Sequence, residues 1–147
     1  MNRISSMLKF LLDRIDTVDT KMDDIGTIYS NVTNKAIAVN PPSIDTYVVG
    51  ASVSLPAGTY IIEGYWTFSG GNPNADRNID VDLSTNGTSA SAGVLARQRV
   101  VTARQVYSRL SVTRIITLNS ATTIYVKGSS STPTDSAENG IRAIRIK

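Results

Sequence analysis

The sequence contains no cysteine and no histidine, and these two absences remove much of the usual chemistry of enzymes. Without a thiol or an imidazole, the chain has no cysteine nucleophile, no Ser-His-Asp triad, no disulfide and no Cys/His zinc site. The sequence also places no second carboxylic acid for a glycosidase-type acid pair. We therefore expect a protein that is not an enzyme, with no catalytic residue and no cofactor.

Long apolar runs are also missing. The start, MNRISSMLKFLLDRID, has a short apolar stretch that Lys9, Asp13, Arg14 and Asp16 interrupt well before the length of a signal peptide or a membrane span. We expect no membrane insertion. A net charge of +3 with scattered basic residues predicts no nucleic-acid partner. The 41% hydrophobic and 18% charged residues are ordinary for a folded chain.

The N-terminal segment carries a heptad pattern. Apolar residues recur at alternating steps of three and four, at Met1, Ile4, Leu8, Leu11, Ile15, Val18, Met22, Ile25, Tyr29 and Val32. This spacing is typical of helices that supercoil around one another. The heptad a positions are Leu8, Ile15, Met22 and Tyr29, and the d positions are Ile4, Leu11, Val18, Ile25 and Val32. We expect residues 1–32 to form a coiled-coil stalk that oligomerises through this seam.

The residues at d indicate the number of strands. Most d positions hold β-branched residues, which disfavour two-stranded packing and favour three or more helices, so we expect a homotrimer. Gly26 and the polar stretch 31–34 predict that the helix frays by about residue 30. The alternative is one amphipathic helix packed on its own domain, but such a helix has a broader apolar face and a period near 3.6.

Residues 33–44 are interpreted as a linker, because Pro41 and Pro42 forbid a helix. From Tyr47 onward the period becomes two, which predicts a head over residues 45–147. The segment 59–68 places Tyr60, Ile62, Trp66 and Phe68 on a buried face and Ile61, Glu63, Tyr65 and Thr67 on the other. Further strands are predicted at 78–84, 94–101, 106–118, 122–128 and 140–147.

Turn residues separate these strands at 56–58, 70–74, 86–87, 129–133 and 139–140. Several short strands at this spacing indicate an all-β head, an antiparallel β-sandwich and most plausibly a jelly roll. In the strand over 78–84 we expect Ile79, Val81 and Leu83 to point inward, and Asp80 and Asp82 outward.

Four stretches of the head carry a resemblance. They are SLPAGTY at 54–60, SVTRIITL at 111–118, TIYV at 123–126 and the closing IRAIRIK at 141–147. In this order they resemble the C-terminal head domains of bacteriophage fibres, which are themselves similar to complement C1q and tumour-necrosis-factor jelly rolls. The resemblance covers about residues 45–147 and implies heads that trimerise around a threefold axis next to a stalk. Most such fibres carry long N-terminal attachment modules, whereas this sequence starts with the stalk.

Arginines are concentrated in the head. Arg97 and Arg99 share one face of a strand, and Arg109 lies between Tyr107 and Ser111 on an outward face. One interpretation is that these arginines lie on solvated faces and form salt bridges between subunits, to Asp80, Asp82 or Glu63. The other is an anion-binding patch for an acidic cell-surface glycan. With the aromatic residues Tyr65 and Tyr107, which could stack on sugars, Arg97, Arg99 and Arg109 are the candidate surface-binding residues.

The acidic residues of the head gather in one stretch, which contains Asp76, Asp80 and Asp82 with Asn72 and Asn74. Oxygen ligands of this kind suit calcium, but their spacing matches no calcium loop, so we expect no metal. Trp66 is assigned to the core.

These features favour a structural virion protein of a bacteriophage, a trimeric tail fibre or receptor-binding protein located in the virion, on the tail or the capsid surface. Its partners would be other virion proteins, bound through the N-terminal helix, and a host cell-surface glycan, bound by the head. Two alternatives stay open: a capsid decoration or head fibre protein, and a secreted C1q-like lectin.

Overall fold

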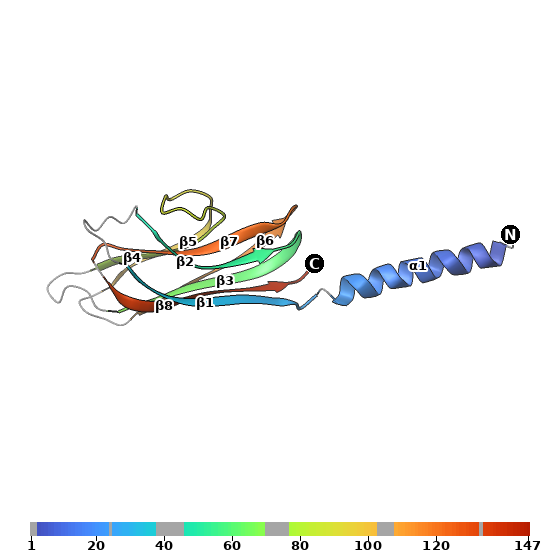
Figure 1. The fold of residues 1–147 in the computed structure, drawn as a ribbon, viewed down its shortest axis with the longest axis horizontal. Coiled ribbons are helices and arrows are strands. Elements are labelled where there is room, and N and C mark those ends of the chain that lie inside the picture. Colours follow the sequence, from blue (N-terminus) through green and yellow to red (C-terminus); the bar gives the residue numbers. More distant parts are fainter. Residues whose placement is uncertain (1–2, 24, 38–45, 70–76, 103–107, 133) are drawn as a thin grey trace.

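The computed structural model describes residues 3–23, 25–37, 46–69, 77–102, 108–132 and 134–147. A helix is followed by strands that build two sheets (Figure 1). The elements are α1 (Arg3–Asp23), β1 (Ile28–Ile37), β2 (Val48–Leu55), β3 (Gly58–Phe68), β4 (Arg77–Ser84), β5 (Val94–Thr102), β6 (Ser108–Leu118), β7 (Thr122–Ser130) and β8 (Thr134–Arg145).

The strands form two antiparallel layers. Sheet A has the order β1-β8-β3-β6, and sheet B has the order β2-β7-β4-β5. The first strand therefore pairs with the last, the second with the seventh, the third with the sixth and the fourth with the fifth. This is one long hairpin rolled into a sandwich, which is the arrangement of a jelly roll. The expected all-β sandwich is confirmed.

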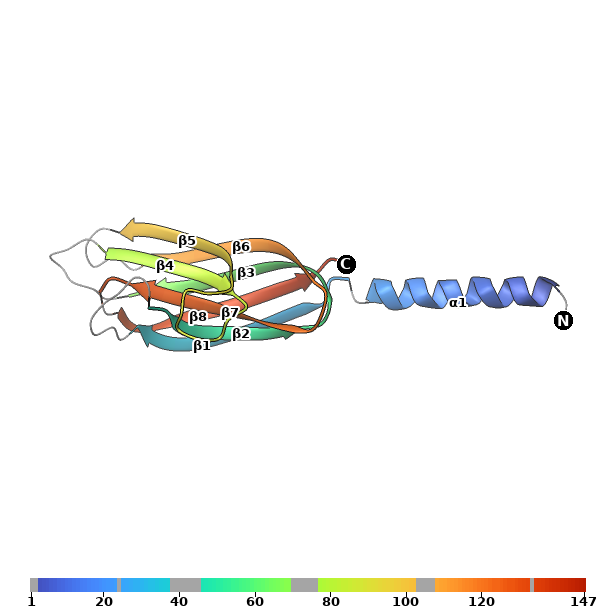
Figure 2. The same ribbon diagram turned by 90° about the horizontal axis from the view of Figure 1, so that it is seen from above.

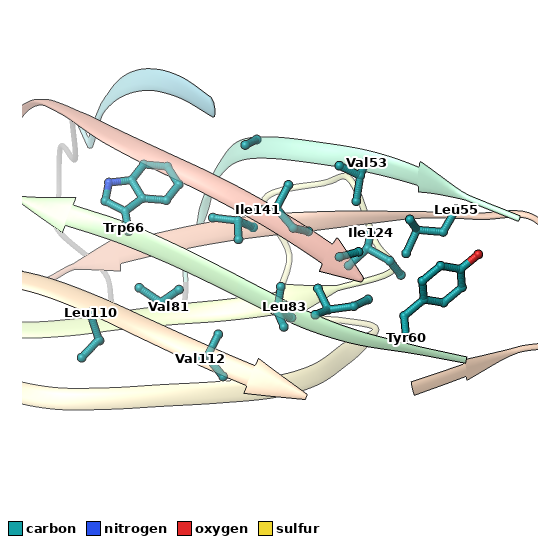
Figure 3. Close-up of a cluster of buried hydrophobic side chains, with 14 of the residues drawn as sticks. Val53, Leu55, Tyr60, Trp66, Val81, Leu83, Leu110, Val112, Ile124 and Ile141 are labelled. Atoms are coloured by element: carbon teal, nitrogen blue, oxygen red, sulfur yellow. The ribbon is translucent and has the colours of Figure 1, made fainter. Parts of the chain in front are cut away.

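The core lies between the two sheets. Trp66 and Tyr60 of β3 are fully buried, and the side chains of sheet B facing them include Val81, Leu83 and Ile124 (Figure 3). The alternation expected along β3 is confirmed, because Tyr60, Ile62, Trp66 and Phe68 have no exposed surface. A two-layer sandwich buries one face of each sheet, so the alternating apolar positions supply the core.

The boundary between stalk and head differs from the expected one. α1 ends at Asp23 and β1 starts at Ile28, so residues expected at the end of the stalk and in the linker form a strand of sheet A. Gly26 adopts a positive φ of 88°, which glycine tolerates without strain, and its N–H donates to the Arg145 carbonyl at 2.8 Å. The ladder with β8 gives residues 28–37 backbone partners that outweigh the heptad signal. Residues 38–44 of the expected linker lie outside the described residues.

Tyr29 is the clearest correction to the expected seam. It lies in β1 opposite Ala143 of β8, and its ring meets Tyr60 edge-on with centroids 6.0 Å apart. Its ring therefore belongs to the head core, and Tyr29 is no longer a heptad residue. Val32 also lies in β1, and Ile25 follows the end of α1.

The helix stands apart from the sandwich. Both views show α1 leaving the end of the head where the C-terminus lies and continuing along the long axis of the molecule (Figures 1 and 2). Leu8, Leu11 and Ile15 are each about half exposed, at 55%, 48% and 54%. The alternative of a helix packed on its own domain is therefore wrong for this structure.

The expected turn at 139–140 is also wrong, because both residues lie inside β8. The Asn139 side chain is buried, and its Oδ1 accepts from Thr33 Oγ1 and from the Ala51 N–H, both at 2.7 Å. The amide thus links β1, β8 and β2 across the two sheets. Gly140 lies beside the Tyr65 ring, and a Cβ there would be 2.6 Å from that ring. An Asn-Gly pair normally indicates a turn. Here the asparagine supplies a buried amide, and the glycine allows the backbone to approach the Tyr65 ring closely.

Gly128→Ala tests the packing of the core. A Cβ on Gly128 would lie 2.5 Å from Cδ2 of the buried Trp66 ring, which cannot move aside. We expect the free energy of unfolding to fall by about 1–3 kcal/mol. The matched control is Gly87→Ala, whose Cβ meets only the outer end of the half-buried Tyr125 ring, for an expected change within about 0.5 kcal/mol. Urea unfolding at one protein concentration compares them, and equal losses would contradict the packing argument.

Candidate functional site

The candidate surface-binding residues divide between the two sheets. Arg97 and Arg99 lie on β5 at the edge of sheet B, whereas Arg109 on β6 and Tyr65 on β3 lie on the outer face of sheet A. Tyr107 lies outside the described residues. The candidate residues that the sequence suggested as one surface therefore lie in two separate groups, one on each sheet.

Arg97 and Arg99 hold two buried carboxylates. Arg97 donates from Nε and Nη2 to the two carboxylate oxygens of Asp82 at 2.7 and 2.8 Å. Arg99 makes the same fork to Asp80 at 2.7 and 2.5 Å. Both carboxylates lie on the outer face of sheet B, as expected, because Ile79, Val81 and Leu83 of the same strand point into the core. They are nevertheless almost completely buried. A buried carboxylate needs such a partner, because an unpaired charge out of water is costly.

The pairing follows from the strand register. Asp80 lies opposite Arg99 and Asp82 opposite Arg97, so the spacing of two in each strand brings both pairs together. The expected partners Asp80 and Asp82 are confirmed, but both salt bridges form within one chain and not between subunits as expected. The matching Asp-x-Asp and Arg-x-Arg spacings in successive strands are the signal that could have predicted it.

Tyr47 and Lys127 complete this group, which we call the charged layer of sheet B. Tyr47 donates its hydroxyl to Asp80 at 3.0 Å, and the Arg97 guanidinium lies 5.2 Å from the centre of the Tyr47 ring. Burial, followed by the charges of the two carboxylates, raises the pKa of Tyr47 to about 12. Lys127 has no exposed surface, and burial lowers the pKa of its ammonium group.

The loop between β4 and β5 covers the charged layer. Lys127 Nζ donates to the Ala90 carbonyl at 2.8 Å, the Tyr47 N–H donates to the Ser89 carbonyl at 3.0 Å, and Arg97 Nη2 donates to Ser91 Oγ at 2.6 Å. Because the forks of both arginines already bind carboxylates, they do not present a free bidentate site to an anion from outside. The charged layer fastens the loop onto sheet B.

The second group lies on sheet A. The Arg109 guanidinium stacks 3.7 Å from the centre of the Tyr65 ring, and Tyr65 donates its hydroxyl to Glu138 Oε1 at 2.7 Å. Burial first, and then the bond to Glu138, raise the pKa of the Tyr65 phenol. Arg109 and Glu138 are exposed. Since Arg109 occupies one face of the ring, this group offers polar contacts to a ligand in preference to stacking on a sugar.

The heptad residues fall into three sets. Leu8, Leu11 and Ile15 are exposed on α1, Ile25 is exposed just after it, and Tyr29 belongs to the head. Ile4, Val18 and Met22 lie in α1, but their side chains are outside the described residues. The part of the seam that the structure describes therefore faces solvent.

Two further surveys cover only the part of the chain that the structure describes. There, no three Asp or Glu side chains gather as they would around a metal ion. Asp76, Asn72 and Asn74 of the acidic stretch lie outside that part. Among the helices described, none is both long and apolar enough to cross a membrane.

Comparison with known proteins identifies no family. No family model matches the sequence, and no curated protein does. Solved structures are similar in shape. One is a chain from the viral particle of infectious bursal disease virus. The match covers 83% of this chain and 32% of the viral chain, with a TM-score of 0.54 and 11% sequence identity. Another is a chain from the VP2 subviral particle of the same virus. That match covers 83% of this chain and 34% of the viral chain, with a TM-score of 0.54 and 12% sequence identity.

The globular domain of the zebrafish complement 1qA protein matches 82% of this chain and 97% of its own, with a TM-score of 0.49 and 10% identity. This chain spans about a third of the length of the viral chains that it matches. The likeness to the two viral chains is one of fold alone, and it agrees with the jelly-roll strand order of the head.

Arg97→Met tests whether the charged layer is structural. The change leaves the Asp82 carboxylate buried without its fork, and we expect the free energy of unfolding to fall by about 3 kcal/mol. Arg109→Met is the matched control, because it removes an exposed stacking contact and should cost less than about 1 kcal/mol. Denaturant unfolding of both variants decides. If both variants lose the same small amount of unfolding free energy, Arg97 is a surface residue without a structural role.

The raised pKa of Tyr47 predicts a pH dependence. The folded phenol keeps its proton above its ordinary pKa of 10.0, so its contribution to stability is complete below pH 10 and is lost as the pH rises through about 12. Near neutral pH, Tyr47→Phe should lower the free energy of unfolding by about 1–2 kcal/mol. The difference from the parent protein should narrow between these two pH values. Unfolding measured across this range checks it, and a constant difference would count against the buried bond to Asp80.

Proposed function

We propose that this protein is a structural component of a bacteriophage virion, a homotrimeric tail fibre or receptor-binding protein whose head contacts the host cell surface. The observation that carries the proposal is the helix itself: α1 extends away from a jelly-roll head (Figure 1). Its heptad residues Leu8, Leu11 and Ile15 are exposed. The protein would lie on the tail or capsid surface and have no catalytic role.

The helix favours an oligomer for a physical reason. An isolated helix of 21 residues is only marginally stable in water, and Leu8, Leu11 and Ile15 expose about half of their surface. Other copies of the same helix would cover these residues with the period that the sequence provides. The β-branched d residues that remain within α1, Ile4 and Val18, favour three helices. The helix is also the part of the protein available for attachment to other virion proteins.

The head favours a structural role in a virion. Its jelly roll is the fold that it shares with the two viral particle structures described above, and the charged layer keeps the loop between β4 and β5 fixed on sheet B. A rigid head of this kind suits a projection that carries a binding surface into solution.

Binding to a host glycan would depend on the number of binding sites that act together. The group formed by Arg109, Tyr65 and Glu138 is exposed and polar, and it is small. Such a site binds weakly by itself, but three copies on one stalk act together, which can raise the apparent affinity by a factor of about 100 or more. The trimer is therefore part of the proposed binding mechanism.

A second candidate is a capsid decoration or head fibre protein. The observation that favours it is the likeness of the head to viral particle proteins. In that case the helix would seat on the particle and the head would only project from it.

Leu11→Asp tests the fibre proposal. Asp at a d position puts a charge into the apolar seam, so we expect the parent protein to sediment as a trimer and the variant to need at least about a 100-fold higher concentration to do so. The control is Phe10→Asp, since Phe10 is exposed on the same helix turn but lies off the seam. Sedimentation gives the mass, and circular dichroism confirms that the head of each variant stays folded.

The same proteins distinguish the two candidates. With a fluorescent label, the trimer should bind to host cells and the Leu11→Asp protein should lose that binding, whereas Phe10→Asp keeps it. A trimer that binds virus particles but no host cell favours the decoration protein. A parent protein that is monomeric at micromolar concentration contradicts the trimeric fibre.

A further inference from the structure

Four isoleucines cross the outer face of sheet A in one row. In register, Ile28 of β1 lies opposite Ile144 of β8, Ile144 lies opposite Ile61 of β3, and Ile61 lies opposite Ile115 of β6. We call these four residues the isoleucine row. It runs over every strand of the sheet, from one edge to the other.

The side chains of the row point away from the core. Their neighbours along each strand, Tyr29, Ala143, Ile62 and Ile116, pack inward, and successive residues of a strand point to opposite faces. Ile28, Ile61 and Ile115 are exposed, and Ile144 is half-buried. An antiparallel sheet that faces water on one side normally presents polar residues there, so an aligned apolar row across the whole sheet marks a contact surface.

The two outer faces of the sandwich differ. The outer face of sheet B carries the charged layer and is covered by the loop between β4 and β5. Its exposed apolar residues Val94 and Val101 lie near opposite ends of β5 and form no row. On sheet A, one side of the row is bordered by polar residues, with Glu63 and Arg142 opposite each other and both exposed. On the other side lies the exposed Ile146, whose N–H donates to the Thr59 carbonyl.

We propose that the isoleucine row packs against neighbouring copies of this chain in the oligomer that the helices gather, so that head and stalk share one interface. The inference rests on the trimer of the proposed function and adds a second contact to it. A second copy is the occupant that the geometry favours, because the row lies at the end of the head from which α1 leaves. Only Ile25 and a short turn separate the helix from Ile28, and both isoleucines are exposed.

The symmetry of a trimer fits a row of this shape. Around a threefold axis each contact joins two different patches of neighbouring copies, and the ring closes when every copy offers both. The row provides one patch at the β1 edge of sheet A, at Ile28, and another at the β6 edge, at Ile115. Next to the row, Glu63 and Arg142 carry opposite charges that neighbouring copies can match.

Single cysteines test the proposal, because the sequence contains no cysteine of its own. Ile115→Cys reports on the row and Val101→Cys on sheet B, at residues that are 62% and 64% exposed in the single chain. A second matched pair is Ile61→Cys and Val94→Cys, at residues that are 38% and 39% exposed. Each full-length variant is reacted with an uncharged maleimide at a concentration where sedimentation shows the oligomer.

We expect both row cysteines to react at least about tenfold more slowly than their partners, which corresponds to about 1.4 kcal/mol of protection. Each variant is also made with Leu11→Asp and measured at a concentration where sedimentation shows a monomer. There the members of each pair should react at similar rates, which removes any difference in intrinsic thiol reactivity.

The possible outcomes are distinct. Equal rates within each pair in a protein that sediments as an oligomer would overturn the isoleucine row and leave the coiled coil intact. A parent protein that sediments as a monomer would overturn both. Slow reaction that persists in the monomeric Leu11→Asp background would mean that the chain's own helix covers the row, which would overturn the contact between copies.

Discussion

The pairing of β1 with β8 is the contact on which the rest of the architecture depends. It joins the segment that follows the helix to the last strand of the chain, from Ile28 opposite Ile144 to Ile37 opposite Thr134. Because the ladder starts so soon after Asp23, α1 has only a short turn at Gly26 in which to leave the head. The same register sets Ile28 beside Ile144 and places Tyr29 against Tyr60. One strand pair thus determines the exit of the helix, the edge of the core and half of the isoleucine row.

The sequence predicted most of the head because its local signals agree with its tertiary structure. Along β3 the alternation of apolar residues matched the burial of Tyr60, Ile62, Trp66 and Phe68. β1 was missed because Ile25, Tyr29 and Val32 also fit a heptad, and the period of a short segment does not by itself distinguish a strand from a helix. The ladder to β8 decides between them, and it joins residues 97 to 116 positions apart in the sequence, from Ile37 with Thr134 to Ile28 with Ile144.

The candidate site was only partly predictable for a related reason. The sequence pointed to Arg97 and Arg99 as a pair, and alternation correctly placed Asp80 and Asp82 on the outer face of their strand. It did not show that Tyr47, Lys127 and a loop cover them. Arg109 and Tyr65 come together only because β6 and β3 are neighbours in sheet A. The isoleucine row also depends on register across four strands, and each isoleucine alone is an ordinary strand residue.

The two outer faces of the sandwich each carry a group that is unfavourable by itself: buried charge on sheet B and exposed apolar surface on sheet A. Sheet B buries charge, and it does so with paired forks that leave neither carboxylate alone. Sheet A exposes apolar side chains on its outer face. No other part of the chain that the structure describes covers them, so a covering surface must come from another molecule. In the proposed trimer, the helices alone would gather three heads but provide no contact that sets the orientation of one head relative to the next. A contact along the isoleucine row would fix that orientation, and fixed spacing between binding surfaces is what lets several weak sites act at once.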